Sequence, residues 1–286
     1  MKNQKIVSIL GVCIAILSAI ASATGIFYTG GPGQYPYQSI RNETINIYGQ
    51  GLYHHMSADV AIQGIAQDYV TLFIGIPLLL ISLAMFRKGT LRARLLLAGV
   101  LNYFFLTYLF YMNMAMYNAF FIIYVLLVST TFFAFALTLI GFNVETLPEH
   151  FSPGTPVKSI GGFLIFLAFS IALLWLQIII APLLDGTIIP KSVEHYTSLT
   201  VQGFDLSIFL PAAFLSGLLL MKKKPYGFLL APVTLILLSI LMTALVAKII
   251  AMAQAGVNVI PAVFIIPTFN ILAIAGAYML FKNIKE

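Results

Sequence analysis

The feature that most constrains this chain is a series of apolar stretches, each about as long as a membrane-spanning helix. They cover residues 6–28, 69–86, 95–116, 119–142, 161–184, 204–221, 228–253 and 262–281. A helix of roughly 20 apolar residues crosses the hydrocarbon core of a bilayer. Only 8% of the residues are charged, against about 25% in a soluble domain, which is too few for a water-facing surface. We therefore predict an all-α, polytopic membrane protein with about eight transmembrane helices and one integral membrane domain, residues 1–286.

The distribution of basic residues predicts how the spans are oriented in the membrane. If each stretch crosses the membrane once, most of the 15 Lys and Arg residues fall on one side, namely Lys2, Lys5, Arg87, Lys88, Arg92, Arg94, Lys158, Lys222, Lys223, Lys224, Lys282 and Lys285. Short cytoplasmic loops carry such an excess of Lys and Arg. We expect a multi-pass protein of a prokaryotic cell membrane with both termini cytoplasmic. The net charge of +6 is then an orientation signal and does not indicate nucleic-acid binding.

The N-terminus has two interpretations. A basic start, an apolar run and the small residues Ala21-Ser22-Ala23 are typical of a cleavable signal peptide. The apolar run continues through Tyr28, however, which is longer than an ordinary signal and long enough to span. We favour a retained helix, and cleavage of residues 1–23 stays the alternative.

Two long connections, residues 29–57 and 185–199, are expected on the outer side. The first begins with a Gly- and Pro-rich stretch, residues 30–37, which predicts irregular or turn-rich backbone. Long loops on a compact membrane protein are often functional. A lid over an outward-facing cavity and a loop without a ligand are both open interpretations.

The chain also shows signs of an internal duplication with halves 1–150 and 151–286. Asp68 precedes Pro77 and a basic loop, and Asp205 precedes Pro211 and a second basic loop. Four spans in each half would give a tandem 4+4 parallel repeat, an arrangement that often encloses a central site. The spacing drifts between the halves, so chance similarity among apolar helices is the alternative.

Polar residues inside the spans are the candidates for a binding site. Asp59, Gln63, Gln67 and Thr71 recur every four residues and form one stripe on a helix, with Asp68 beside it. Polar side chains in a membrane face protein or water rather than lipid.

Further candidates come from other spans: Gln202 and Asp205 in the second half, Asn102 and Tyr103 in the third span, and Lys248 in the seventh. Lys248 is the expected cation for the two aspartates, because its helix ends on the same side. For the amides and the tyrosine, interhelical hydrogen bonding without any ligand is the alternative.

A metal site would have to use His54, His55 and His195, with nearby carboxylates such as Asp59 and Glu194. Adjacent histidines point apart, and the sequence contains no HxxxH or HExxH pattern, so we favour no metal and expect no cofactor. The single cysteine excludes an intrachain disulfide and a Cys-pair redox centre.

Three segments, residues 48–53, 66–72 and 195–197, resemble a family of prokaryotic multi-spanning membrane proteins. They read Tyr48-Gly49-Gln50-Gly51-Leu52-Tyr53, Ala66-Gln67-Asp68-Tyr69-Val70-Thr71-Leu72 and His195-Tyr196-Thr197. The resemblance implies the same helical architecture and no particular activity.

Our leading hypothesis for function is a carrier or permease-like protein for a small solute, with a polar cavity open to the outer side. A membrane-embedded enzyme acting on a lipid or envelope precursor is the alternative, and a sensor or assembly subunit is the third. The sequence identifies neither a catalytic residue nor a solute.

Overall fold

The computed structural model of the protein describes residues 3–114 and 116–285. In these residues eight helical runs are long and apolar enough to span a membrane, which confirms the predicted all-α, polytopic fold. The runs are α1 (Gln4–Phe27), α2 to α3 (Ala58–Phe86), α4 (Leu91–Met114), α5 (Phe121–Ile140), α6 (Val157–Asp185), α7 to α8 (Thr200–Met221), α9 (Pro225–Gln254) and α10 (Ala262–Lys282). Lys2, which we assign to the inner side, lies outside the described residues, as does Met1, the first residue of the possible signal segment.

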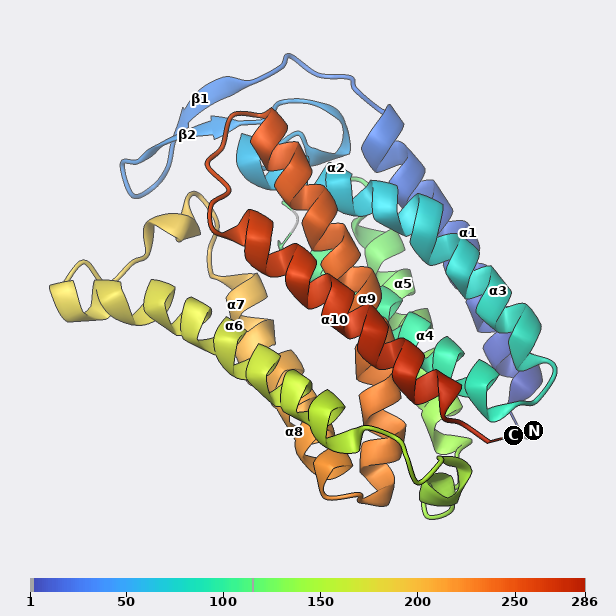
Figure 1. The fold of residues 1–286 in the computed structure, drawn as a ribbon. Helices are drawn as coiled ribbons and strands as arrows, with labels where there is room; N and C mark the ends of the chain where they lie inside the picture. Colours follow the sequence, from blue (N-terminus) through green and yellow to red (C-terminus); the bar gives the residue numbers. More distant parts are fainter. Residues whose placement is uncertain (1–2, 115, 286) are drawn as a thin grey trace.

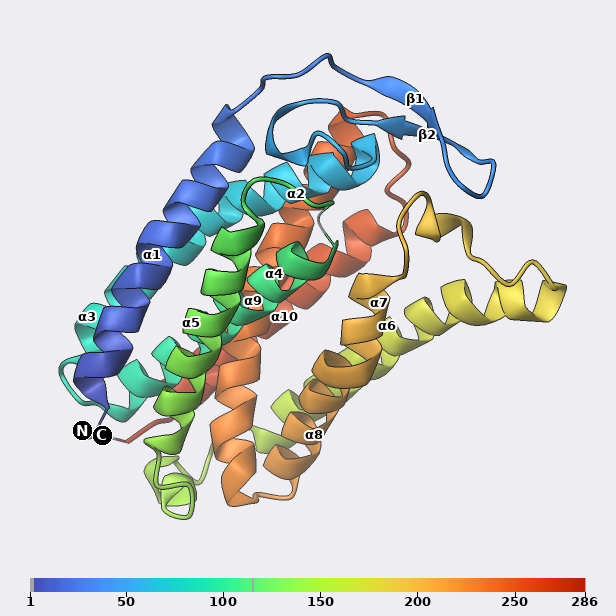
Figure 2. The same ribbon diagram turned by 180° about the vertical axis from the view of Figure 1, so that it is seen from behind.

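The bundle has two distinct ends, which Figures 1 and 2 show from opposite sides. The chain termini lie at one end, called here the terminal end, together with the short 3-10 helix η3 (Leu147–His150). The other end, called the hairpin end, carries strands β1 (Tyr35–Gln38) and β2 (Thr44–Ile47) and the 3-10 helices η1 (Gly51–Tyr53) and η4 (Lys191–Val193). Both long loops predicted from the sequence therefore lie at the hairpin end.

The helix of the second span begins at Ala58, directly after the predicted outer loop, and its first turns carry Asp59 and Gln63, members of the predicted polar stripe. One detail of the sequence prediction is wrong. Residues 30–37 are not all irregular, since Tyr35 to Gln38 pair with Thr44 to Ile47 in an antiparallel hairpin. Aromatic and β-branched residues favour these strands despite Pro36, which an edge strand tolerates.

The second and sixth spans share an unusual feature. A π-helical segment, η2 (Thr71–Gly75), joins α2 (Ala58–Val70) to α3 (Ile76–Phe86), and η5 (Asp205–Phe209) joins α7 (Thr200–Phe204) to α8 (Leu210–Met221). Pro77 and Pro211 are the second residues of α3 and α8. A proline inside a helix lacks an N–H group and clashes with the carbonyl four residues earlier. The wider π turn accommodates this in both places, and such π segments are frequent at functional sites.

Aligning the two prolines refines the comparison of the halves. In that alignment Asp205 matches Thr71 and Asp68 matches Gln202. The two aspartates therefore stand about one helical turn apart with respect to the π segments. The shared order of helix, π segment and proline is a structural feature of both halves, while a common origin of the halves stays a prediction.

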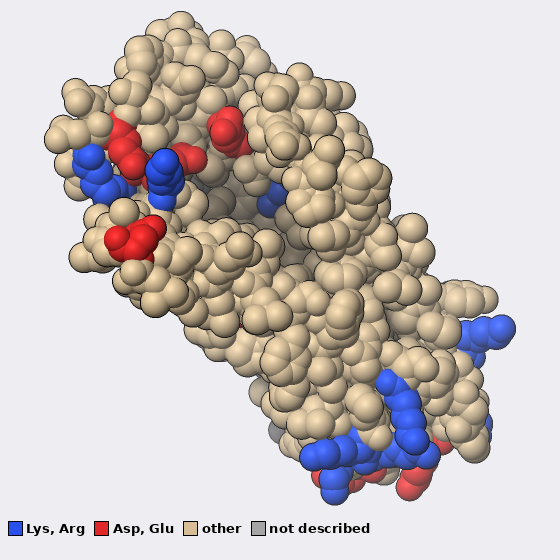
Figure 3. Space-filling model, turned by 60° about the vertical axis from the view of Figure 1, so that its left-hand side comes forward, with Lys and Arg blue, Asp and Glu red and all other residues tan. Residues whose placement is uncertain are grey.

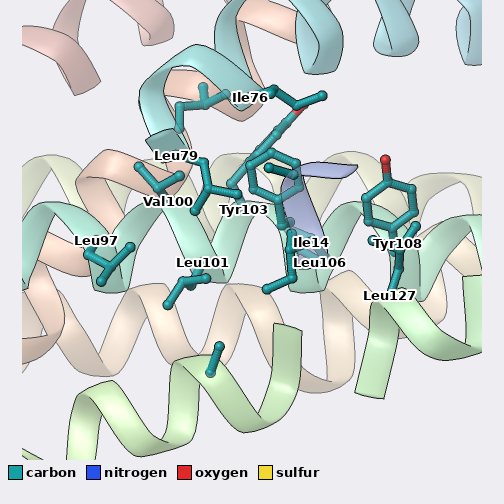
Figure 4. Close-up of a cluster of buried hydrophobic side chains, with 14 of the residues drawn as sticks. Ile14, Ile76, Leu79, Leu97, Val100, Leu101, Tyr103, Leu106, Tyr108 and Leu127 are labelled. Carbon is teal, nitrogen blue, oxygen red and sulfur yellow. The ribbon is translucent and has the colours of Figure 1, made fainter. Parts of the chain in front are cut away.

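Two apolar clusters form the interior. One lies among α1, α3, α4 and α5 and includes Ile14, Leu79, Leu101, Tyr103 and Leu127 (Figure 4). The other lies among α6, α8, α9 and α10. Helices α4 and α9 contribute to both clusters, so they form the centre of the bundle.

Glycines allow the closest helix contacts. A Cβ at Gly11 of α1 would lie 2.6 Å from Leu83, and one at Gly161 of α6 would lie 2.5 Å from the carbonyl of Gly217 on α8. At the centre, a Cβ at Gly99 of α4 would overlap Ile236 of α9. Small residues let helix backbones approach in this way where no hydrophobic effect drives association.

The second half is more open than the first. Helix α1 packs against both α3 and α5, whereas α6 packs on α8 and barely touches α10. Towards the hairpin end α6 extends away from the bundle (Figures 1 and 2). This divergence separates α6 and α7 from α9 and α10 near Asp205.

Candidate functional site

Asp68 lies in a sealed polar pocket between α1, α2 and α4. Its side chain is only 3% exposed and accepts a hydrogen bond from the hydroxyl of Tyr53 and a longer one, 3.2 Å, from that of Tyr111. The Tyr111 hydroxyl also lies 2.9 Å from the carbonyl oxygen of Gly64. Gly25 closes the pocket from α1, because a methyl group there would overlap Asp68 Oδ2. No solute could reach this carboxylate without movement of a helix.

The polar stripe predicted on α2 splits into two parts. Gln67 Nε2 donates to the Tyr103 hydroxyl over 2.8 Å, and Thr71 Oγ1 lies 2.8 Å from the same oxygen. Tyr103 is fully buried, so these three residues crosslink the second span to α4. Gln63 instead donates to the backbone carbonyl of Asp59 in its own helix. Asn102 is half-buried and, as the neighbour of Tyr103, occupies a different face of α4.

A group of tyrosines extends the polar interior beyond Asp68. The rings of Tyr108, Tyr111 and Tyr124 lie 5.6 to 6.3 Å apart, centroid to centroid. Ser22 approaches Tyr108 and Asn118 approaches Tyr124, but without hydrogen-bond geometry, and both hydroxyls lack a partner among the described residues. Tyr53, at the end of η1, and Tyr111 were not predicted as partners of Asp68. Their sequence separation from it gives no signal of the contact.

Asp205 has a different environment. It is half-buried at the start of the π segment η5, and its Oδ2 accepts a hydrogen bond from Trp175 Nε1 on α6 over 2.8 Å. Gln202 stands three residues earlier on α7, so it shares the face of Asp205. Trp175, the one tryptophan of the chain, was not predicted as a partner of Asp205. A buried indole N–H needs an acceptor, and this requirement was the signal that could have indicated the contact.

Lys248 links the two aspartates electrostatically. It is half-buried on α9, and its ammonium group interacts through space with both Asp205 and Asp68. In the described part of the chain, Lys248 forms no ion pair within 4.0 Å with either carboxylate. Of the basic residues in the described spanning helices, it alone stands near the hairpin end. Lys248 thus lies within electrostatic range of both aspartates, and their joint role in a site stays a prediction.

A hollow opens in the protein surface close to the hairpin end (Figure 3). A basic side chain is visible inside it, and acidic side chains stand near its rim. The other basic side chains of that view gather mainly at the opposite end of the molecule. The hollow lies on the side where α6 diverges from the bundle, as comparison with Figure 1 indicates.

The two long loops are joined above the bundle. Arg41, near the tip of the hairpin, donates to the backbone carbonyls of Glu194 (2.7 Å) and Tyr196 (2.6 Å). The backbone N–H of Ser57 donates to the Tyr196 hydroxyl over 3.1 Å. Burial raises the pKa of Tyr196, so its phenol stays protonated at neutral pH. The loops therefore form one cap over the hairpin end.

The histidines belong to this cap. His195 Nε2 lies 3.0 Å from the backbone carbonyl oxygen of His55, and the ring of His54 stands edge-on to that of His55, 4.6 Å between centroids. Across the described residues, no group of three or more His, Cys, Asp or Glu side chains is placed to hold a metal ion.

We expect that Arg41→Gln loosens the cap without disturbing the bundle. The substitution removes two charge-assisted hydrogen bonds between loops that are far apart in sequence. Hydrogen exchange followed by mass spectrometry should show at least tenfold faster exchange in residues 186–199 and unchanged exchange in α4 and α9. Lys191→Gln, which changes an exposed charge of the same region, is the control. Equal exchange in both variants would mean that Arg41 does not hold the loops together.

Comparisons with protein-family models, with curated proteins and with solved structures found no match to this chain.

Proposed function

We propose that this multi-spanning membrane protein is a carrier for a small polar solute, which binds in the hollow near the hairpin end between Lys248 and Asp205. The observation that supports it most is Lys248 itself. A cationic group in a membrane-spanning helix is costly and usually serves a substrate or ion pathway. Lys248 interacts through space with two carboxylates and yet lacks a close ion pair with either. We infer that the solute binds between these charges.

The two aspartates have different roles in this proposal. Asp205 is half-buried and is oriented by Trp175, and we infer that it contacts the solute together with Lys248. Asp68 is sealed behind Gly25 and held by Tyr53 and Tyr111. It is a positioning residue, which acts on the solute only through its electrostatic attraction for Lys248.

The interrupted helices support a mechanism for movement of the site. The two π segments interrupt the helices that carry Asp68 and Asp205, and carriers commonly use such interrupted helices at their binding sites. Close glycine contacts join α1 to α3 and α6 to α8. We infer that transport rocks the α6 and α8 unit against the central helices α4 and α9.

The proposal includes an orientation. Basic residues gather at the terminal end, and short loops rich in Lys and Arg are cytoplasmic. The hollow and its cap would then face the outside of a prokaryotic cell membrane. No cofactor takes part in this scheme, and the solute and the lipid bilayer are its proposed partners.

Uptake into proteoliposomes tests this proposal. The panel contains four labelled solutes of different charge: alanine, lactate, ethylammonium and glucose. A site with one cation and one carboxylate should favour the zwitterion, alanine, and Lys248→Met should reduce its uptake at least tenfold. Lys222→Met, at the terminal end, should leave it unchanged. Uptake that is equal in the Lys248→Met protein, or no uptake above empty liposomes for any of the four, would contradict the proposal.

A further inference from the structure

A second cavity lies at the terminal end, far from the hollow. It has a volume of about 450 Å³ and is bordered by the turn between α3 and α4, the first residues of α4, and the segment that follows α5. Because α4 begins and α5 ends there, we expect the cavity to stand at the level of the lipid headgroups. None of its lining residues belongs to the proposed transport site.

One part of the lining, called here the rim, is basic. It consists of Lys88, Arg94 and His150. Glu145 and Glu149 belong to the same segment but do not line the cavity. The lining residues therefore carry a net positive charge, which favours an anionic ligand.

Arg94 is held in place for such a ligand. Its guanidinium lies 4.2 Å from the centre of the Phe142 ring and donates to the carbonyl oxygen of Gly141. A guanidinium has five N–H donors in a rigid plane, and among the described residues these contacts occupy only part of them. A planar, fixed guanidinium suits the oxygens of a phosphate group.

Another part of the lining, called here the base, is apolar. It consists of Leu91, Phe142 and Leu147, of which the last two are buried in the protein. Inorganic phosphate would use only the basic rim and would leave this surface uncovered. An amphiphile uses both, because its phosphate meets the cations while its glycerol and first methylenes cover the apolar base.

We propose that this cavity binds the phosphodiester headgroup of an anionic phospholipid, with Lys88 and Arg94 as the phosphate ligands. Basic pockets between helices at the cytoplasmic surface are suited to such headgroups. Thr90 supports the site, since its hydroxyl oxygen accepts the backbone N–H of Ala93 over 3.3 Å and so ends the turn beside Lys88 at the start of α4.

Native mass spectrometry of the full chain in detergent tests the proposal. The probes are phosphatidylglycerol, phosphatidylcholine and inorganic phosphate, each titrated at the same ionic strength. We expect retention of one phosphatidylglycerol at concentrations where phosphatidylcholine is not retained. Lys88→Gln should weaken this binding about fivefold, the effect of one cation near a membrane surface.

Two control variants test whether the effect on lipid binding is specific to this cavity. Lys222→Gln removes an exposed charge at the same end of the protein and should leave phosphatidylglycerol binding unchanged. Leu91→Gln tests the apolar base: it should weaken binding of the lipid but not of inorganic phosphate. Equal lipid affinity in the Lys88→Gln and Lys222→Gln proteins would overturn the site. Inorganic phosphate that binds as tightly as the lipid would overturn its assignment to a phospholipid.

Discussion

Gly25→Ala is expected to destabilise the protein by roughly 2 to 4 kcal/mol, the combined effect of overpacking and a damaged buried hydrogen bond. The added methyl group would overlap Asp68 Oδ2 and would lie 3.0 Å from the Tyr53 hydroxyl. Either the carboxylate turns away from its phenol donors, or α1 moves away from α2. Reversible unfolding in mixed micelles measures the loss.

The matched control is Gly162→Ala on α6. A Cβ at that position meets nothing within 4 Å, so the better helix propensity of alanine should leave stability unchanged or slightly raised. A second comparison isolates the contact, because Gly25→Ala should cost much less when it is made in an Asp68→Ala protein. If Gly25→Ala costs the same in both backgrounds, the loss does not come from the contact with Asp68.

Asp205→Asn should abolish transport while stability changes by less than about 1 kcal/mol. The amide oxygen can still accept the Trp175 N–H, and the site is partly open, so little is left unpaired. Solute binding loses the negative charge that complements Lys248. Initial rates of uptake, measured beside thermal unfolding, should fall at least tenfold with an unchanged midpoint.

Asp68→Asn should behave differently. Two phenol hydroxyls donate to this buried carboxylate, and an amide cannot accept both equally well, so we expect a loss of roughly 1 to 3 kcal/mol. Lys248→Met combined with each aspartate variant completes the test. If Lys248→Met restores the stability of an aspartate variant and transport is intact, the charges only hold helices together and the proposed roles are wrong.

The sequence predicts the architecture because the length and hydropathy of its apolar stretches determine the number of spans. Eight apolar stretches predict eight spans, and the structure contains them with small shifts at their ends. The apolar stretch of the second span begins later than its helix, because the first turns of the helix carry Asp59 and Gln63.

The candidate site was readable only in part. Asp68, Asp205 and Lys248 stand out because ionisable groups in a membrane are costly, and Lys248 lies within electrostatic range of both aspartates. Their partners could not be predicted, since Tyr53, Tyr111 and Trp175 reach them through packing of distant segments. The same holds for Arg41, which joins two loops about half the chain apart.

Accessibility of Gln202 from both sides of the membrane tests the central claim most directly. Gln202→Cys, in a Cys13→Ser protein, places a thiol on the face of α7 that carries Asp205. Gln34→Cys at the hairpin end and Tyr226→Cys at the terminal end are the one-sided controls. A carrier that exposes its site alternately predicts that an impermeant thiol reagent labels Gln202→Cys both in right-side-out and in inverted vesicles, while each control is labelled in only one. Labelling of Gln202→Cys from the hairpin side alone would contradict a carrier.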